Sequence, residues 1–282
     1  MLPRCMLALF LLAVGRYGVT QQGHDNDASD PFRIADGLYY VGSSDMASLL
    51  VTTPEGHILI DAGYPETVPI IQANVAALGL RLTDIKILLN TQAHFDHAGG
   101  FAGMKQLTGA RLVVSDADAD VIERGGHGDF LFGDRNPFPP AHVDRRLKDG
   151  DQVRLGGVVL TAHVTGGHTK GCTTWTFDAT DKGRTYHVVD VGGTSVLDGM
   201  RLSGMPTYPS IGTDFERTFR TLKELPCDIF LGAHASYFDG RAKAARLRSN
   251  PDGPNPFVDP AGCRAFVERA EARFLELRAA QP

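Results

Sequence analysis

The most constraining feature of the sequence is the turn at residues 91–100, TQAHFDHAGG, which follows the apolar run IKILLN. His94, Asp96 and His97 lie close together in this turn, directly after a predicted buried strand. A tight turn can direct these two imidazoles and one carboxylate at one small volume. Imidazole nitrogen and carboxylate oxygen are ligands that Zn²⁺ binds at about 2.0–2.2 Å. We therefore interpret the turn as part of a candidate zinc site.

Two other histidines follow predicted strands in the same way. His168 lies among glycines in TGGHTKG, where the backbone can approach a ligand closely, and His234 ends the apolar segment IFLGAH. Open sheets place their functional sites at strand ends, so both histidines are candidate ligands. Asp61, in LIDAG, is a candidate carboxylate for orienting a ligand, and a turn or N-cap aspartate is the alternative.

Apolar segments bounded by turn residues predict the fold. A β-rich stretch is followed by alternating strands and helices, and this order repeats in the second half of the chain. The expected strands cover residues 38–42, 47–53, 57–63, 85–90, 111–115, 151–155, 157–165, 173–179, 185–191 and 227–234. The expected helices cover residues 68–78, 116–124, 213–225 and 262–279, and a further helix is expected between the turn at 91–100 and the strand at 111–115. Two similar halves, each a sheet with helices on its outer side, predict an αββα sandwich that forms one domain over residues 21–282.

The composition and the N-terminus indicate an exported protein. With 28 Lys+Arg, 33 Asp+Glu and no basic run, the chain shows no sign of a nucleic-acid partner. The apolar run at residues 6–15 follows a positive charge and is shorter than the roughly 20 residues that a membrane span needs. We interpret residues 1–20 as a cleaved secretory signal, with a buried first strand or a retained anchor as alternatives. Export to an oxidising compartment permits disulfides and removes Cys5 from the four cysteines.

The turn at 91–100, the segment 138–177 and LPCDIFLGAH at 225–234 resemble the metallo-β-lactamase superfamily, and within it subclass B3, secreted zinc enzymes of Gram-negative bacteria. The resemblance runs from about residue 34 to about residue 280. It implies the αββα fold, a dinuclear zinc site between the sheets, and hydrolysis of the β-lactam amide bond by metal-bound hydroxide, which confers antibiotic resistance. We expect a periplasmic monomer that acts on a small-molecule β-lactam and contacts no membrane once the signal is removed.

The family pattern H-x-H-x-D-H falls on residues 92–97 and assigns two groups of ligands. The resemblance implies that the first-site residues are Gln92, His94 and His168, and that the second-site residues are Asp96, His97 and His234. Asp96 is also implied to be catalytic, because it can hold the attacking water. Gln92 departs from the usual histidine, and its neutral amide oxygen is a weaker zinc ligand, so we expect one or two Zn²⁺ per chain with a weakened first site.

The segment after the strand at 185–191 also bears on the site. Subclass B3 has a serine there, and Thr194 and Ser195 are the candidates for binding substrate or water. Asp190 is an alternative ligand, because glyoxalase II and related lactonases use an aspartate after this strand to bridge two metals. The long loop at 125–142, rich in Gly and Pro, is expected to close over the substrate with Phe130, Phe132 and Phe138. His127 in this loop is a candidate substrate contact.

The remaining cysteines follow from the resemblance as well. Subclass B3 enzymes have a disulfide in the positions that Cys227 and Cys263 occupy. Cys172 is then unpaired, and we interpret it as a buried, inert thiol, with a metal ligand or a redox role as the alternative. Two other functions stay open. The first is another hydrolase on the same fold, a lactonase or thioesterase, which Asp190 favours. The second is an exported zinc-binding protein with a degenerate site, which Gln92 favours.

Overall fold

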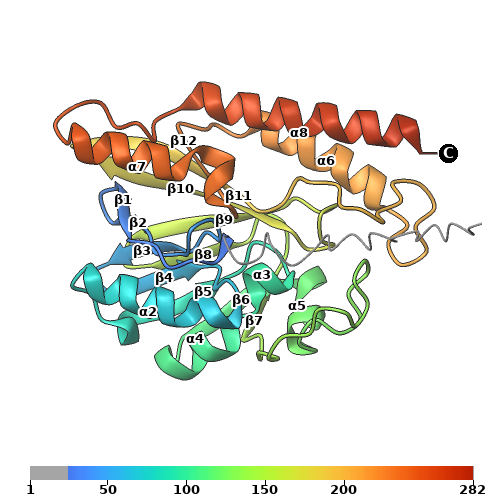
Figure 1. The fold of residues 1–282 in the computed structure, drawn as a ribbon, viewed down its shortest axis with the longest axis horizontal. Coiled ribbons are helices and arrows are strands. Elements are labelled where there is room, and N and C mark those ends of the chain that lie inside the picture. The colour runs from blue at the N-terminus through green and yellow to red at the C-terminus, as the bar shows by residue number, and fades with distance from the viewer. Residues whose placement is uncertain (1–24, 282) are drawn as a thin grey trace, which may run out of the picture.

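The computed structural model describes residues 25–281, in which two β-sheets pack face to face between two layers of helices (Figure 1). The first sheet has seven strands in the order β1 (Phe32–Ala35), β2 (Leu38–Tyr40), β3 (Leu49–Thr53), β4 (Gly56–Ile60), β5 (Ile85–Leu89), β6 (Arg111–Ser115) and β7 (Arg145–Leu147). The second has five strands in the order β12 (Ile229–Gly232), β11 (Arg184–Val191), β10 (Thr173–Asp181), β9 (Val158–Val164) and β8 (Gln152–Leu155). Each half of the chain thus builds one sheet.

The helices cover the outer faces of the sheets. Over the first sheet lie α2 (Val68–Ala77), α4 (Phe101–Thr108) and α5 (Asp116–Glu123), and over the second lie α6 (Ile211–Glu224), α7 (Gly240–Ser249) and α8 (Pro260–Ala280) (Figure 1). The short α3 (Phe95–Ala98) follows β5, and the 3-10 turns are η1 (Pro65–Thr67), η2 (Leu82–Asp84) and η3 (Ala235–Phe238). This arrangement is the predicted αββα sandwich.

Strand β4 shows how the first sheet packs on both of its faces. All five of its residues are buried, because both faces of the strand are covered. Ile58 and Ile60 belong to the core between the sheets, where Trp175 of β10 also lies. Leu59 points the other way, into a second core that includes Ile71 of α2. The period of two in a strand therefore assigns alternate residues to two separate cores.

Some elements differ from those predicted. Helix α7 was not expected, because its sequence GRAKAARLRS is dominated by charged and small residues and gives little apolar periodicity. The last strand is shorter than residues 227–234 and stops at Gly232, so His234 lies beyond the strand end. The proposed secretory signal, residues 1–20, lies outside the described residues. Among residues 25–281, no helix combines the length and the apolar composition needed to cross a bilayer.

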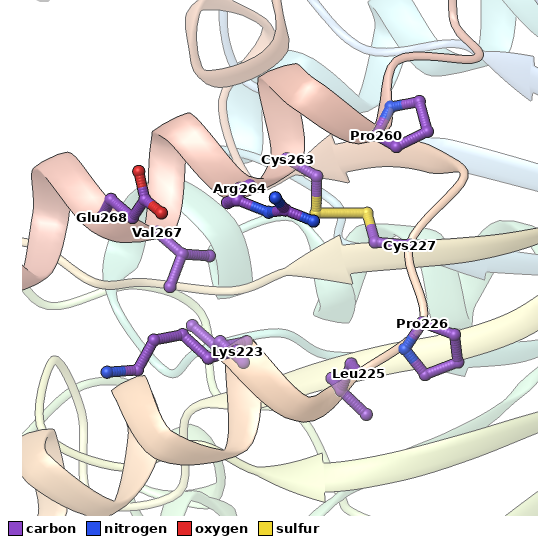
Figure 2. A pocket seen from close by; sticks show the side chains of 10 residues that line it. Lys223, Leu225, Pro226, Cys227, Pro260, Cys263, Arg264, Val267 and Glu268 are labelled. Atoms are coloured by element: carbon purple, nitrogen blue, oxygen red, sulfur yellow. A yellow bond between two sulfur atoms is a disulfide. The ribbon is translucent and has the colours of Figure 1, made fainter.

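The predicted disulfide between Cys227 and Cys263 is present. It ties the segment that leads into β12 to the first turn of α8, and it lies beside a groove between α6 and α8 (Figure 2). Lys223 and Glu268 line the same groove from the two facing helices. Cys172, the unpaired cysteine, is fully buried as expected.

Candidate metal centre

The candidate site is built on segments that follow strand ends, where the two sheets meet. The first sheet contributes the turn after β5, and the second contributes the segments after β9 and β12. Asp96 and His97 lie in α3, and His234 directly precedes η3. Ligand atoms of these three second-site residues all lie within 4.8 Å of one another. Residues far apart in sequence therefore converge on one volume.

The first-site residues lie beside this group. The rings of His94 and His168 are 4.8 Å apart and nearly perpendicular. Gln92 is buried, and its Oε1 atom has no hydrogen-bond partner among the described residues. The same holds for Nε2 of His94 and for Nε2 of His97. Buried polar atoms without partners are rare and costly, and a bound cation would satisfy all three, so these residues fit a metal.

The charges in the site also favour a cation. Burial lowers the pKa of His94 well below its ordinary value and lowers that of His168 to about 4, so both imidazoles are neutral at pH near 7 and have a free lone pair. Burial acts to raise the pKa of Asp96, but the surrounding imidazoles, that of His97 foremost, together outweigh burial and lower this pKa. Burial would lower the pKa of His97, yet the carboxylates of Asp96 and Asp61 raise it to about 10. Two carboxylates beside one buried imidazole make a site that stabilises positive charge.

Three supporting contacts orient the histidines. Nδ1 of His168 lies 2.8 Å from the backbone oxygen of Ser195, and Nδ1 of His97 lies 3.3 Å from Oδ2 of Asp61. Nδ1 of His234 lies 3.0 Å from Oδ2 of Asp45. For His168 and His234 the contact occupies Nδ1 and leaves Nε2 free to bind a metal, which is the usual arrangement around protein metal ions. His97 lies between two carboxylates, because its Nε2 is also 3.4 Å from Oδ2 of Asp96.

Asp61 takes the orienting position that its place after a strand predicted. Its carboxylate accepts hydrogen bonds from the backbone nitrogen and the hydroxyl of Thr91, which begins the ligand-bearing turn. Asp61 has a φ of 59°, in the left-handed region that non-glycine residues rarely adopt. Backbone strain of this kind concentrates at functional sites, where the surroundings hold the residue in place.

Asp45 is a site residue that the sequence analysis missed. It lies between β2 and β3, and its other carboxylate oxygen, Oδ1, accepts a hydrogen bond of 2.8 Å from the backbone nitrogen of Ser236. This contact fixes the start of η3, the turn that follows His234. The available signal was an aspartate in a short polar loop between two predicted strands, which by itself indicates only a turn.

Ser195 and Thr194 were predicted to bind substrate or water. The structure places Ser195 against His168, with its Oγ atom 3.2 Å from Nδ1 in addition to the backbone contact, and Thr194 is 4% exposed. Asp190 lies outside the group of converging ligand atoms, and both of its carboxylate oxygens are buried without a hydrogen-bond partner among the described residues. Burial, and then the nearby charge of Asp61, raise the pKa of Asp190 well above its ordinary value, which favours a neutral carboxyl.

Phe132 of the loop at 125–142 lies directly against the site. Phe132 packs edge-on against His94, with ring centroids 5.0 Å apart. Phe130 and Phe138, which were also expected to close over the substrate, are both 8% exposed and belong to the two cores. Phe138 also lines a small cavity together with His94 and Phe132. His127 is half exposed and lies 3.3 Å from Asp134 of the same loop; its contact with substrate stays a prediction.

The fold and the site agree with the comparisons. The family model of the metallo-β-lactamase superfamily matches residues 46–181, and the chain belongs to this superfamily. Native FEZ-1 metallo-β-lactamase from Legionella gormanii is 44% identical, with a TM-score of 0.88 over 91% of this chain and 98% of that chain. BJP-1, a subclass B3 metallo-β-lactamase of Bradyrhizobium japonicum, is 36% identical, with a TM-score of 0.86 over 92% of this chain and 97% of that chain.

Curated relatives carry a different name. A hydroxyacylglutathione hydrolase from Rhodopseudomonas palustris (strain BisB18) is 31% identical over 197 residues, which cover 69% of this chain. The match spans 63% of that relative, less than two thirds of its length. The resemblance to the superfamily and the predicted fold are thereby confirmed, and the fold, the site and the relatives together support a metal-dependent hydrolase.

Proposed function

We propose that this protein is a zinc-dependent hydrolase that opens the amide bond of β-lactams. The observation that carries the proposal is the likeness to solved metallo-β-lactamases, which extends over 98% of the Legionella gormanii enzyme at 44% identity. The hydroxyacylglutathione hydrolase relative is less similar and is matched over a smaller share of its length. The likeness to β-lactamases therefore covers a complete enzyme fold rather than a shared core.

The residues that would hold zinc are the first-site and second-site residues. Asp96, His97 and His234 supply a compact set of one carboxylate and two imidazoles, which suits Zn²⁺. His94 and His168 supply two more imidazoles, and Gln92 supplies an amide oxygen that binds more weakly. Bound zinc makes a nucleophile available from water at neutral pH and offers positive charge to the carbonyl oxygen and to the departing nitrogen. We expect one ion to bind tightly at the second site and another to bind more weakly at the first.

The protein's own groups would then position the reactants. Asp96 is ionised and its side chain is 21% exposed, so its carboxylate can accept a hydrogen bond from the attacking water and hold it toward the carbonyl carbon. Phe132 and Phe95, whose rings are 5.9 Å apart, form an apolar wall beside His94 that excludes solvent from one side of the substrate. Ser195, whose Oγ atom lies near Nδ1 of His168, is proposed to contact the substrate carboxylate.

A second candidate function is hydrolysis of a thioester or lactone on the same scaffold. The name of the Rhodopseudomonas palustris relative favours it. Asp190, the residue that suggested it from the sequence, does not lie with the converging ligand atoms, which removes one argument for a bridging aspartate. The two functions share the metal and differ in the shape of the substrate that the site accepts.

The test compares substrates on one preparation. Protein lacking residues 1–20 is purified, loaded with Zn²⁺, and assayed with a chromogenic cephalosporin, a glutathione thioester and an acyl homoserine lactone. We expect preferential turnover of the cephalosporin, and loss of turnover with a chelator and in His97→Ala. The matched control is His163→Ala, which removes a histidine outside both ligand groups and should leave turnover unchanged. Preferential turnover of the thioester or lactone would favour the second candidate, and no turnover at all would favour a zinc-binding protein without catalysis.

Export and oligomeric state belong to the same proposal. We propose that the protein is periplasmic, because a short apolar run follows a positive N-terminus and a disulfide joins Cys227 to Cys263. We also propose that it is a monomer. N-terminal sequencing of protein from the periplasmic fraction should find a start near residue 21. Light scattering after gel filtration should give the mass of one chain, and a dimer mass would contradict the monomer.

A further inference from the structure

Asp118 is a buried carboxylate in α5 that stands outside the candidate ligand set. It is 1% exposed and accepts three hydrogen bonds. Its Oδ2 atom accepts from the backbone nitrogen of Ala93 at 3.0 Å and from the hydroxyl of Thr169 at 2.6 Å. Its Oδ1 atom accepts from the backbone nitrogen of Gly171 at 2.7 Å. All three donors therefore come from two loops that lie far from each other in sequence.

These two loops carry the first-site residues. Ala93 stands between Gln92 and His94, and Thr169 directly follows His168. One carboxylate thus holds the backbone on both sides of the first site at a fixed separation. We infer that Asp118 is a positioning residue that sets the distance between the loops of Gln92, His94 and His168, and thereby the affinity of the first site for its metal. The inference rests on the metal-binding part of the proposed function.

The contact between α5 and the second of these loops is close enough to exclude a side chain. A Cβ atom at Gly171 would stand 2.1 Å from Oγ of Ser115 and 2.6 Å from the backbone nitrogen of Asp118. The hydroxyl of Ser115 also donates to the backbone oxygen of Gly171 at 2.6 Å. The loop after His168 therefore packs closely against the start of α5, and both the backbone nitrogen and the backbone oxygen of Gly171 are hydrogen-bonded there.

A purely structural role explains Asp118 less well. Burying an ionised carboxylate carries a desolvation penalty, and replacing a buried hydrogen-bonded pair by apolar groups of the same shape can be nearly neutral or stabilising. Among the described residues, no lysine, arginine or histidine forms an ion pair with Asp118, so its partners are three neutral donors. The second site is held by different groups, because His97 contacts Asp61 and His234 contacts Asp45. Loss of Asp118 should therefore affect the first site selectively.

The test measures zinc binding at each site alone. Asp118→Asn keeps the shape of the side chain but offers one acceptor oxygen, so its amide group must face a backbone N–H of Ala93 or Gly171. The dissociation constant for Zn²⁺ is measured by competition with a chromophoric chelator in two backgrounds. His234→Ala removes a second-site ligand and isolates the first site, and His168→Ala isolates the second. We expect Asp118→Asn to weaken binding about 10- to 100-fold in the first background and less than about 3-fold in the second.

The controls separate positioning from general damage. Asp120→Asn, on the same helix, removes an exposed carboxylate that pairs with Arg146, and it should change neither dissociation constant. Circular dichroism checks the fold of each variant, and if Asp118→Asn does not fold, Thr169→Val removes one donor and decides the matter. Equal weakening at both sites, first-site binding within about 3-fold of the parent, or no zinc binding by the His234→Ala parent would each overturn the inference. A wild type that binds zinc but does not hydrolyse the cephalosporin would refute only the β-lactamase proposal.

Discussion

Removing the disulfide between Cys227 and Cys263 should destabilise the protein without changing its site. The bond closes a loop with a sequence separation of 36 residues. In the chain-entropy description, a loop of this length reduces the entropy of the unfolded chain by an amount worth about 4 kcal/mol near 25 °C. For a chain of this size that corresponds to a fall of roughly 7 °C in the midpoint of thermal unfolding. Cys263 is 5% exposed, so alanine is the appropriate replacement at both positions.

The assay is urea unfolding of the wild type and of the Cys227→Ala/Cys263→Ala variant, both in chelator so that metal binding does not contribute. A reductant supplies the matched control, because it should bring the wild type close to the variant and leave the variant unchanged. Zinc-loaded turnover at 25 °C should be the same for both proteins, since the bond lies beside the groove between α6 and α8 and no candidate ligand lines this groove (Figure 2). A difference in unfolding free energy below about 1 kcal/mol would refute the loop-entropy reasoning.

Three further predictions concern single side chains. Asp45→Asn should weaken zinc binding at the second site by about 10- to 100-fold in a chelator competition, because the orientation of His234 depends on this carboxylate; an unchanged constant would contradict that role. Burial raises the pKa of Cys172 to about 12, so a thiol reagent should label no cysteine in native protein lacking residues 1–20 and one cysteine after unfolding. Burial raises the pKa of Asp118 from 3.8 to about 6, so the folded state keeps this proton to higher pH than the unfolded state. The unfolding free energy of the wild type relative to Asp118→Asn should therefore fall by on the order of 3 kcal/mol as the pH rises from about 4 to about 7. Urea unfolding in chelator measures this difference, and a difference that increased with pH would contradict the prediction.

The candidate ligands were predictable because their signal is local. A buried strand followed at once by His94, Asp96 and His97 identifies a site from a few neighbouring residues. His168 and His234 repeat the pattern of a histidine at a strand end. Because strand ends at one edge of a sheet lie together, such residues can be assigned to one site before their distances are known.

The supporting residues were not predictable, because their contacts connect distant parts of the chain. Asp45 and His234 are 189 residues apart, and Asp118 and Thr169 are 51 residues apart. In the sequence DADAD, Asp118 is one of three aspartates that alternate with alanine, and nothing local shows that it alone is buried. The phenylalanines of the loop at 125–142 pose the same problem. Phe132 reaches the site while Phe130 and Phe138 fill cores, and only the tertiary fold distinguishes them.

The site lies where the two sheets meet, so the supply of metal should affect how much of the protein stays folded. His97 comes from the first half of the chain and His234 from the second, so an ion bound to both would cross-link a much longer stretch of chain than the disulfide does. Separating the two halves would require breaking metal–ligand bonds, and binding energy at the site would appear as folding energy. A shortage of zinc would then reduce the number of intact molecules by exposing the opened chain to proteolysis, in addition to leaving the surviving molecules inactive.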